Sequence, residues 1–408
     1  MKPSLSHRDI KRQRFYIFSV FSLTRRQKRI LIWLLPLTFL AIFFFVPLCR
    51  IIFLTFSAET FTTINLRVTN NTLLFTFYQA ALSTLLTLAL GLPSAVLFSR
   101  YDFRGKTLLR ALTAVPFLLP TVVVAAAFNS LFNPNGLLST FYSFISLFSS
   151  SIHPSSFTLH PFLAILLAHV FYNTTIVIRI VGATLSNLNP KLEQTARSLG
   201  ANPLQVWMNV TLPLLRPSIL AASILVFLFD FTSFGVILLL GKSQYSTLET
   251  EIYFQAVRQF NLPLAAVLSV IQLACTLAVS ILYSKYAIRN APQIASRTTP
   301  HRPRSIKQKL FVFTLCSLLT VYFALPLLSL PFRSFTRLEA DRAQRTEVQY
   351  GFTTDYYEEL FINRRGSAFY VPPFQAILNS LTYALATVIL SILLGFPAAF
   401  ALAKPTKL

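Results

Sequence analysis

Long apolar stretches separated by short polar or basic segments run along almost the whole chain. Each stretch is long enough for a helix that crosses the roughly 30 Å hydrocarbon core of a bilayer. The pattern predicts eight membrane-spanning helices, at 30–48, 72–99, 108–132, 161–184, 217–240, 262–285, 309–332 and 374–403. We therefore predict an all-α fold, a polytopic transmembrane helix bundle of about eight spans.

The composition agrees with a surface that faces lipid. Hydrophobic residues make up 54% of the chain and charged residues only 12%, against about 25% charged residues in soluble proteins. The formal net charge is +23, from 36 Lys and Arg against 13 Asp and Glu. Such an excess also occurs in nucleic-acid-binding proteins. Here the cations fall between the apolar stretches, so we predict a lipid bilayer and no nucleic acid as the partner.

The distribution of charge predicts the orientation in the membrane. The segment 133–160 carries no charged residue, and in 333–372 six Arg are balanced by acids. Lys and Arg instead accumulate in 1–29, 100–110, 191–216 and 285–309. Cytoplasmic loops carry such an excess, so we predict a multi-pass protein of the cytoplasmic (inner) membrane with its N-terminus in the cytoplasm. The first apolar stretch is too long for a secretory signal and is interpreted as an uncleaved helix.

No residue pattern predicts catalysis or metal binding. The three cysteines, Cys49, Cys275 and Cys316, lack the spacing of a disulfide framework or a metal site, and the five histidines are scattered. The full phosphate-binding motif G-x-x-x-x-G-K-S/T is absent from the sequence. We predict no catalytic residue, no cofactor and no metal on this chain, so any ATP hydrolysis belongs to another subunit.

Two apolar segments form an internal repeat. Residues 80–95, AALSTLLTLALGLPSA, and residues 384–399, ALATVILSILLGFPAA, share the ending L-G-x-P-x-A. The repeat is parallel and predicts a six-span unit followed by the first two spans of a second, incomplete unit. The predicted organisation is a basic cytoplasmic N-terminus at 1–29, a first unit at 30–285, a cytoplasmic linker at 286–308 and the start of a second unit at 309–408.

The cytoplasmic loop 186–217 is predicted to form two short helices. Asn followed by Pro, at 189–190 and again at 202–203, is the start signal of a helix, an N-cap acceptor before a first-turn proline. A glycine between the two starts supplies a left-handed residue that ends the first helix. Pro213 and Pro217 are predicted to close the second helix.

Both predicted helices carry an apolar stripe at helical spacing. The stripes consist of Leu192, Ala196 and Leu199, and of Leu204, Trp207, Met208 and Thr211. Spacing alone leaves two interpretations equal. The pair of helices either caps the bundle or docks into a groove of a cytoplasmic partner.

The same loop resembles the EAA loop of binding-protein-dependent ABC importer permeases. That loop has Glu-Ala-Ala, a Gly four residues after the last Ala, and then Ile-x-Leu-Pro. The corresponding residues here are Gln194-Thr195-Ala196, Gly200 and Val210-Thr211-Leu212-Pro213, with Glu193 one place early. The wider chain resembles the double-unit permeases of the ferric-iron and thiamine importer group, through the segments 167–174 and 246–257.

The resemblance implies a MetI-like permease unit that moves a solute into the cytoplasm, with ferric iron or thiamine favoured. It implies a cytoplasmic ATPase homodimer that holds ATP and Mg, and an extracytoplasmic solute-binding protein. The incomplete repeat indicates either a truncated gene or fragment, or a unit that a second permease chain completes. The resemblance further implies that the loop couples to the ATPase. Arg197 either meets an acidic ATPase surface or is a solvated cation, and we favour the solvated cation. The coupling residues would be Glu193, Gln194, Thr195, Ala196, Leu199, Gly200, Leu204, Trp207, Val210, Leu212 and Pro213. Within this set and its neighbours, the docking face would comprise Leu192, Ala196, Leu199, Leu204 and Trp207.

Polar residues within the spans suggest a second site. Asp230 lies 13 residues past Pro217, roughly 20 Å along a helix, and an acid at membrane depth defaults to a functional hypothesis. Asp230 and Asn173 either line a translocation pathway or are hydrogen-bonded structural groups. We favour the structural interpretation for Asp230.

Three other function classes would show different sequence features. A stand-alone secondary transporter or channel would need inverted repeats or several charges within the membrane, whereas the repeat here is parallel and such charges are few. A membrane-embedded enzyme would need clustered His, Asp or Glu. A non-functional truncated permease stays open at this stage.

Overall fold

The computed structural model describes residues 33–34, 36–56, 66–132, 138, 159–241, 244–289, 299–337, 351–363 and 370–403. The predicted N-terminal segment 1–29 lies outside these residues. The chain divides into two compact units, one of residues 54–356 and one that combines 1–53 with 357–408. Each unit is described by itself.

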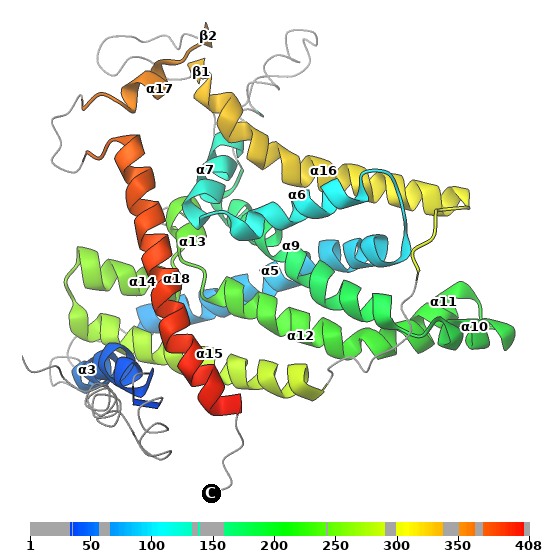
Figure 1. Cartoon of the computed structure of the whole chain (residues 1–408), viewed down its shortest axis with the longest axis horizontal. Coiled ribbons are helices and arrows are strands. Elements are labelled where there is room, and N and C mark those ends of the chain that lie inside the picture. Colours follow the sequence, from blue (N-terminus) through cyan, green and yellow to red (C-terminus); the bar gives the residue numbers. More distant parts are fainter. Residues whose placement is uncertain are drawn as a thin grey trace, which may run out of the picture. The chain divides into compact units, whose positions relative to one another are not determined.

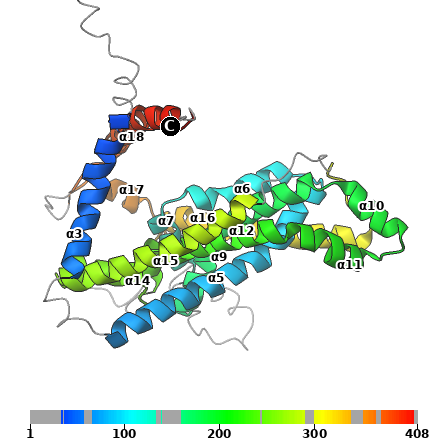
Figure 2. The same ribbon diagram turned by 90° about the horizontal axis from the view of Figure 1, so that it is seen from below.

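The unit of residues 54–356 is a helix bundle (Figures 1 and 2). Its α-helices are α5 (Leu66–Arg100), α6 (Lys106–Leu118), α7 (Thr121–Phe132), α9 (Pro161–Asn187), α10 (Pro190–Ser198), α11 (Pro203–Val206), α12 (Leu212–Phe231), α13 (Gly235–Leu240), α14 (Leu248–Tyr253), α15 (Leu262–Arg289) and α16 (Ile306–Ser334). The π-helical turns are η2 (Trp207–Thr211) and η3 (Phe254–Arg258), and β1 (Thr336–Arg337) pairs antiparallel with β2 (Gly351–Phe352). Both views show α5, α9 and α12 side by side along the bundle.

The other unit contains helices from the two ends of the chain. They are η1 (Ala41–Phe45), α3 (Val46–Thr55), whose last two residues fall in the first unit, and α18 (Pro373–Ala403). The short helix α17 (Asp355–Glu359) crosses the boundary between the units.

Most helices overlap the predicted membrane spans, whereas the span predicted at 217–240 runs from Pro203 to Phe231. Seven described helices are long and apolar enough to cross a bilayer. An eighth crossing is possible only if α6 and α7 count together, because they bend by 110° at the break between them. The prediction of an all-α, polytopic bundle is confirmed.

A close approach of α5 and α9 organises the bundle. A Cβ atom added to Gly91 on α5 would lie 2.6 Å from Cβ of Val177 on α9, which is shorter than any real contact. Only glycine permits this spacing of the two backbones. Gly395 on α18, its counterpart in the sequence repeat, has nothing within 4 Å of the same position.

Aromatic side chains join α16 to the same bundle. The Phe171 ring of α9 lies 5.5 Å from Phe128 of α7 and stacks on Phe323 of α16 at 5.2 Å. The Tyr322 hydroxyl donates to the carbonyl of Leu167 at 2.6 Å. The repeat assigned α16 to a second permease unit, but α16 packs with the preceding helices in the compact unit of residues 54–356. The compact units therefore have different boundaries from the units drawn from the repeat.

Two predicted spans are broken in the structure. The stretch 108–132 is interrupted before Pro120, because a residue that precedes proline is driven out of the helical region, and Leu119 is extended at φ −77° and ψ 143°. The stretch 217–240 is interrupted after α12, where Thr232 caps the helix, and α13 restarts at Gly235. The prediction of continuous helices was wrong at both places.

The prediction that Pro213 and Pro217 close a helix was also wrong. The chain from Pro203 to Phe231 runs as one continuous candidate span. Within it, η2 is a wider π turn, in which the backbone N–H of Leu212 donates to the carbonyl of Trp207. A proline lacks an N–H and its ring crowds the carbonyl four residues earlier, and the wide turn just before Pro213 accommodates that ring.

Candidate functional site

The loop between α9 and α12 forms a helical hairpin with the caps expected from sequence. The side chain of Asn189 accepts a hydrogen bond from the backbone N–H of Lys191 at 3.0 Å, and Pro190 opens α10. Gly200 follows α10 with φ +89°, the left-handed conformation. Asn202 and Gln205 then form a reciprocal capping box at 2.8 and 2.9 Å. These local predictions are confirmed.

Glu193 ties the hairpin to the bundle. Its carboxylate forms an ion pair with Arg100, the last residue of α5. The Thr211 hydroxyl donates to the same carboxylate oxygen at 2.7 Å. The Arg100 guanidinium also lies 5.8 Å from the centroid of the Trp207 ring. Three segments, α5, α10 and η2, therefore meet at one carboxylate.

This environment keeps Glu193 ionised. Burial alone would raise the pKa of its carboxyl group. The hydrogen bonds from Thr211 and Arg100, together with the charges of Arg100 and Arg197, outweigh burial and lower the pKa from its ordinary value of 4.5. A charged Glu193 is the form that holds the guanidinium of Arg100.

Four apolar side chains of the hairpin face solvent, and we call them the hairpin surface. Their exposed fractions are 48% for Leu192, 84% for Leu199, 69% for Leu204 and 51% for Met208. Gln194 and Thr195 are exposed as well, and Ala196 is half-buried. Exposed apolar groups gathered on one element are typical of a protein-interaction surface.

Two residues of the predicted stripes point the other way. Thr211 is buried beneath Glu193. Trp207 is half-buried and packs against the cluster of apolar side chains that joins α5, α9 and α12. Val210, Leu212 and Pro213 are half-buried at the base of the hairpin. The predicted docking face therefore loses Trp207, because the π turn rotates the chain that follows Val206.

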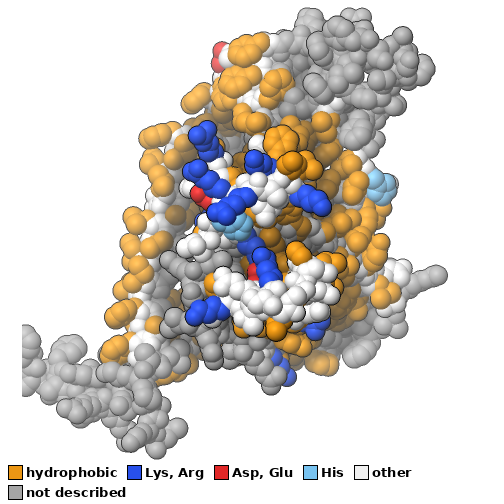
Figure 3. All heavy atoms as spheres, turned by 90° about the vertical axis from the view of Figure 1, so that its right-hand side faces the viewer, with side chains coloured by type: hydrophobic (Ala, Val, Ile, Leu, Met, Phe, Trp, Pro, Cys, Tyr) orange, Lys and Arg blue, Asp and Glu red, His pale blue; other side chains and the backbone are white. Residues whose placement is uncertain are grey.

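Positive charge surrounds the base of the hairpin (Figure 3). The segment 299–305 lies beside the end of α5, since the His301 carbonyl accepts from Asp102 N–H and His301 N–H donates to the Arg100 carbonyl, both at 3.0 Å. The described basic residues of the neighbouring segments are Arg100, Arg104, Lys106, Lys191, Arg197, Arg302, Arg304, Lys307 and Lys309. This end of the bundle is the more basic one that the loop pattern predicted.

Asp230 and Asn173, the two predicted pathway residues, lie in contact. The Asn173 amide donates to the Asp230 carboxylate at 2.7 Å, and Asp230 is 0% exposed. The Gln79 amide donates to the backbone carbonyl of Asp230 at 2.8 Å. The acid is hydrogen-bonded and lies at the end of α12 rather than in mid-helix. Its structural role stays a prediction.

His169 completes this buried cluster. One ring nitrogen lies 3.1 Å from the Ser83 hydroxyl and 3.5 Å from the Asp230 carboxylate, and the other lies 2.9 Å from the Ser233 hydroxyl. The break between α12 and α13 brings Ser233 to the imidazole. The cluster connects α5, α9 and the end of α12 inside the bundle.

Sequence reasoning missed Arg100 and His169 as members of these two sites. Arg100 was counted only as a loop cation, and its partner Glu193 is 93 positions away. His169 was set aside because the histidines are scattered. The partners of both residues lie far away in the sequence, so only the packing of distant helices identifies these contacts.

Comparisons with known proteins agree with this architecture. The sequence pattern of the family described as binding-protein-dependent transport system inner membrane component matches residues 87–289. The sulfate transport system permease protein CysT of Salmonella typhimurium is 32% identical over 221 residues, covering 52% of this chain and 76% of the relative. The thiamine transport system permease protein ThiP of Haemophilus influenzae is 33% identical over 222 residues, covering 53% of this chain but only 40% of the relative.

A solved structure extends the likeness in fold. A chain of a bacterial alginate ABC transporter, in complex with a periplasmic protein bound to an alginate pentasaccharide, aligns with a TM-score of 0.52 at 16% identity. The alignment covers 69% of this chain and 96% of that chain. Fold and hairpin together define a multi-pass membrane permease. The chain belongs to the family of binding-protein-dependent transport system inner membrane components, the permease subunits of ABC importers.

Proposed function

We propose that this chain is the membrane-spanning subunit of an ATP-driven importer and that a cytoplasmic ATPase grips it at the hairpin surface. The observation that carries the proposal is an exposed apolar surface on a hairpin joined to α5 through Arg100 and Glu193. An apolar surface without rigid support could dock but could not transmit a movement. A capped hairpin tied to the bundle can do both.

The proposed ATPase is a homodimer that holds the ATP and Mg. Neither ATP nor Mg is proposed to bind this chain. Docking would use Leu192, Leu199, Leu204 and Met208, with Ala196 at the edge. The remaining predicted coupling residues would support the hairpin, either at its turn or at its base. They are Glu193, Gln194, Thr195, Gly200, Trp207, Val210, Leu212 and Pro213.

The basic end of the bundle would face the cytoplasm. Lys and Arg are enriched in cytoplasmic loops, and Lys and Arg side chains gather at the hairpin end of the bundle (Figure 3). The proposed orientation places the N-terminus in the cytoplasm and the hairpin where an ATPase can reach it.

Further partners follow from the architecture of relatives. The alginate transporter was solved with a periplasmic protein, and a solute-binding protein on the extracytoplasmic side is proposed here too. The repeat supports a first permease unit at 30–285 and the start of a second at 309–408, joined by 286–308.

The proposed solute is thiamine, with sulfate as the next candidate. The support for both comes from the names of the relatives, which share about a third of their residues with this chain over the matched region. Only the resemblance of the sequence to the ferric-iron importer group supports ferric iron as the solute. Uptake of labelled thiamine and labelled sulfate by cells that carry the complete system decides among them, since only the true solute is taken up.

Co-purification tests the docking role. The chain is expressed with the candidate ATPase subunit of its importer, and the amount of ATPase retained by the tagged chain is measured. Leu199→Asp places a charge in the middle of the hairpin surface and should reduce retention at least ten-fold. Ser198→Asp adds the same charge one position away on an exposed residue outside the surface and should retain the ATPase.

A second variant tests transmission rather than docking. Gly200→Asp puts a side chain at φ +89°, where nothing lies within 4 Å, so only the backbone is strained. We expect loss of transport-coupled ATPase activity. Normal transport by this variant, or full ATPase retention by Leu199→Asp, contradicts the coupling role.

A further inference from the structure

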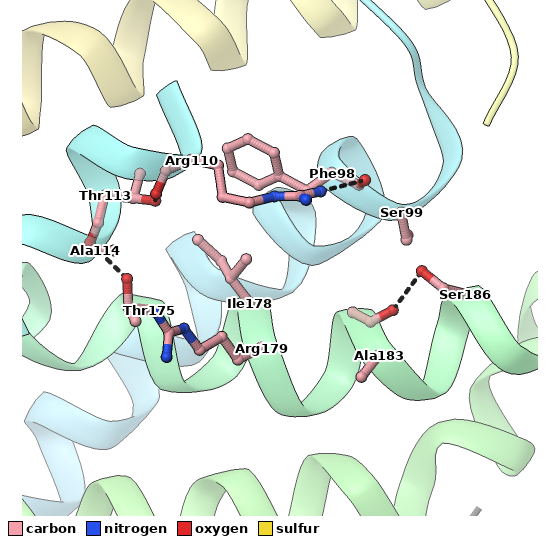
Figure 4. A pocket seen from close by; sticks show the side chains of 11 residues that line it. Phe98, Ser99, Arg110, Thr113, Ala114, Thr175, Ile178, Arg179, Ala183 and Ser186 are labelled. Carbon is pink, nitrogen blue, oxygen red and sulfur yellow. Dashed lines mark hydrogen bonds between the residues drawn. The ribbon is translucent and has the colours of Figure 1, made fainter. Parts of the chain in front are cut away.

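A recess at the hairpin end of the bundle carries two arginines that the proposed function does not use. It lies between α5, α6 and α9 and has a volume of about 300 Å³ (Figure 4). Arg110 projects into it from α6 and Arg179 from α9. Ser186 lines the same recess just before the chain enters α10.

Arg110 is held in place but keeps most of its hydrogen-bonding capacity. One guanidinium nitrogen donates to the backbone carbonyl of Phe98 at 3.3 Å, and the guanidinium lies 5.6 Å from the centroid of the Phe98 ring. A guanidinium has five N–H donors in a planar fork. Stacking on an aromatic ring orients this fork and leaves its other donors available to a ligand.

No carboxylate neutralises the recess within the described part of the chain. Neither Arg110 nor Arg179 forms an ion pair with an acid there, whereas Arg100 does. Both arginines are exposed, and both belong to apolar helices that qualify as spans or as part of a bent pair. An unpaired arginine at such a position is costly in lipid and marks a functional site by default.

The hydroxyl groups of the recess are already engaged. Thr113 donates to the Arg110 carbonyl at 3.0 Å, Thr175 donates to the Thr113 carbonyl, and Ser186 donates to the Gly182 carbonyl at 2.8 Å. The free donors in the recess are therefore the guanidinium groups. The chemistry that matches a guanidinium group in such a recess is a tetrahedral oxyanion, which accepts paired N–H bonds.

We propose that the Arg110–Arg179 recess binds an oxyanion of the phosphate or sulfate type. A volume of about 300 Å³ equals that of about ten waters at roughly 30 Å³ each, so the recess holds the oxyanion and part of the molecule attached to it. Arg179 lies eight residues before the end of α9, about 12 Å along the helix. That depth is within reach of a lipid headgroup and of a solute dissolved in the cytoplasm.

Two binding measurements on the purified full-length chain distinguish these sources. Native mass spectrometry counts adducts of dioleoylphosphatidic acid, with dioleoylglycerol as the lipid that lacks the phosphate. Thermal unfolding in detergent is followed with inorganic phosphate and inorganic sulfate, with chloride at equal ionic strength as the blank. A lipid ligand gives phosphatidic acid adducts only, and a free oxyanion gives stabilisation by phosphate or sulfate.

Arginine variants connect either signal to the recess. Arg110→Gln and Arg179→Gln should each weaken binding at least ten-fold, and Arg110→Lys should weaken it less because the charge stays while the fork is lost. Arg258→Gln is the matched control, since Arg258 is an exposed arginine stacked on Phe254 at 5.9 Å, outside the recess. Helix content by circular dichroism verifies that each variant folds.

Each result of these binding measurements either supports or overturns an oxyanion site in the recess. Binding by the unmodified chain that is lost in both glutamine variants and kept in Arg258→Gln supports it. Absence of binding by every probe, or equal binding by all variants, overturns it. These measurements require no ATPase and no transport, so their result is separate from that of the coupling role.

Discussion

Arg100 at the end of α5 pairs with Glu193 on α10, and the Thr211 hydroxyl donates to the same carboxylate. The pair connects the hairpin to α5, the helix that approaches α9 closely at Gly91 and Val177. The hairpin is therefore joined directly to the end of α5.

Removal of the charge on Glu193 should loosen the hairpin. In Glu193→Gln the ion pair with Arg100 is lost, and because the pair is half-buried we expect a destabilisation of about 1 kcal/mol. We expect the variant to show a lower free energy of unfolding in detergent and a hairpin that proteases cleave more readily. Lys191→Gln removes an exposed cation from the same helix and should change neither.

The same pair predicts a dependence of stability on pH. The pKa of Glu193 is lowered on folding, so its contribution is fully present above the unfolded value near 4.5 and is lost as the pH falls through the lower folded value. The difference in unfolding temperature between the parent chain and Glu193→Gln should be constant from about pH 6 to pH 8. It should shrink below the ordinary carboxyl pKa, and a difference that grows on acidification contradicts the assignment.

Asp230 is expected to be structural. In Asp230→Asn the side-chain oxygen still accepts from the Asn173 amide, so solute uptake and its pH profile should be unchanged. Asp230→Leu leaves that buried amide without its acceptor and should cost about 1–3 kcal/mol in unfolding free energy. A loss of uptake in the folded asparagine variant would instead indicate a role in translocation.

Two glycines related by the sequence repeat should respond differently to substitution. Gly91→Leu drives a side chain into Val177, where even a Cβ atom would be 2.6 Å away, and should destabilise the chain by about 1–3 kcal/mol or prevent folding. Gly395→Leu meets nothing within 4 Å and should be close to neutral. The unfolding temperatures of the two purified variants make the comparison.

Local signals carried most of the correct predictions. The runs of apolar residues identified the spans because membrane crossing depends on length and hydropathy alone. Asn189, Asn202 and Gly200 marked the hairpin because caps and left-handed residues act within a few positions of the chain. The break at Pro120 was readable for the same reason, yet it was missed because prolines within spans are often tolerated.

By itself the sequence determined the class of protein, the positions of its helices and the start and turn of the hairpin. Tertiary structure decided that Trp207 and Thr211 face inward, that Glu193 meets Arg100, that His169 joins Asp230, and that α16 packs with α7 and α9. The reason is physical. Hydropathy and capping depend on neighbouring residues, whereas the side on which a side chain is buried depends on which distant helix lies against it.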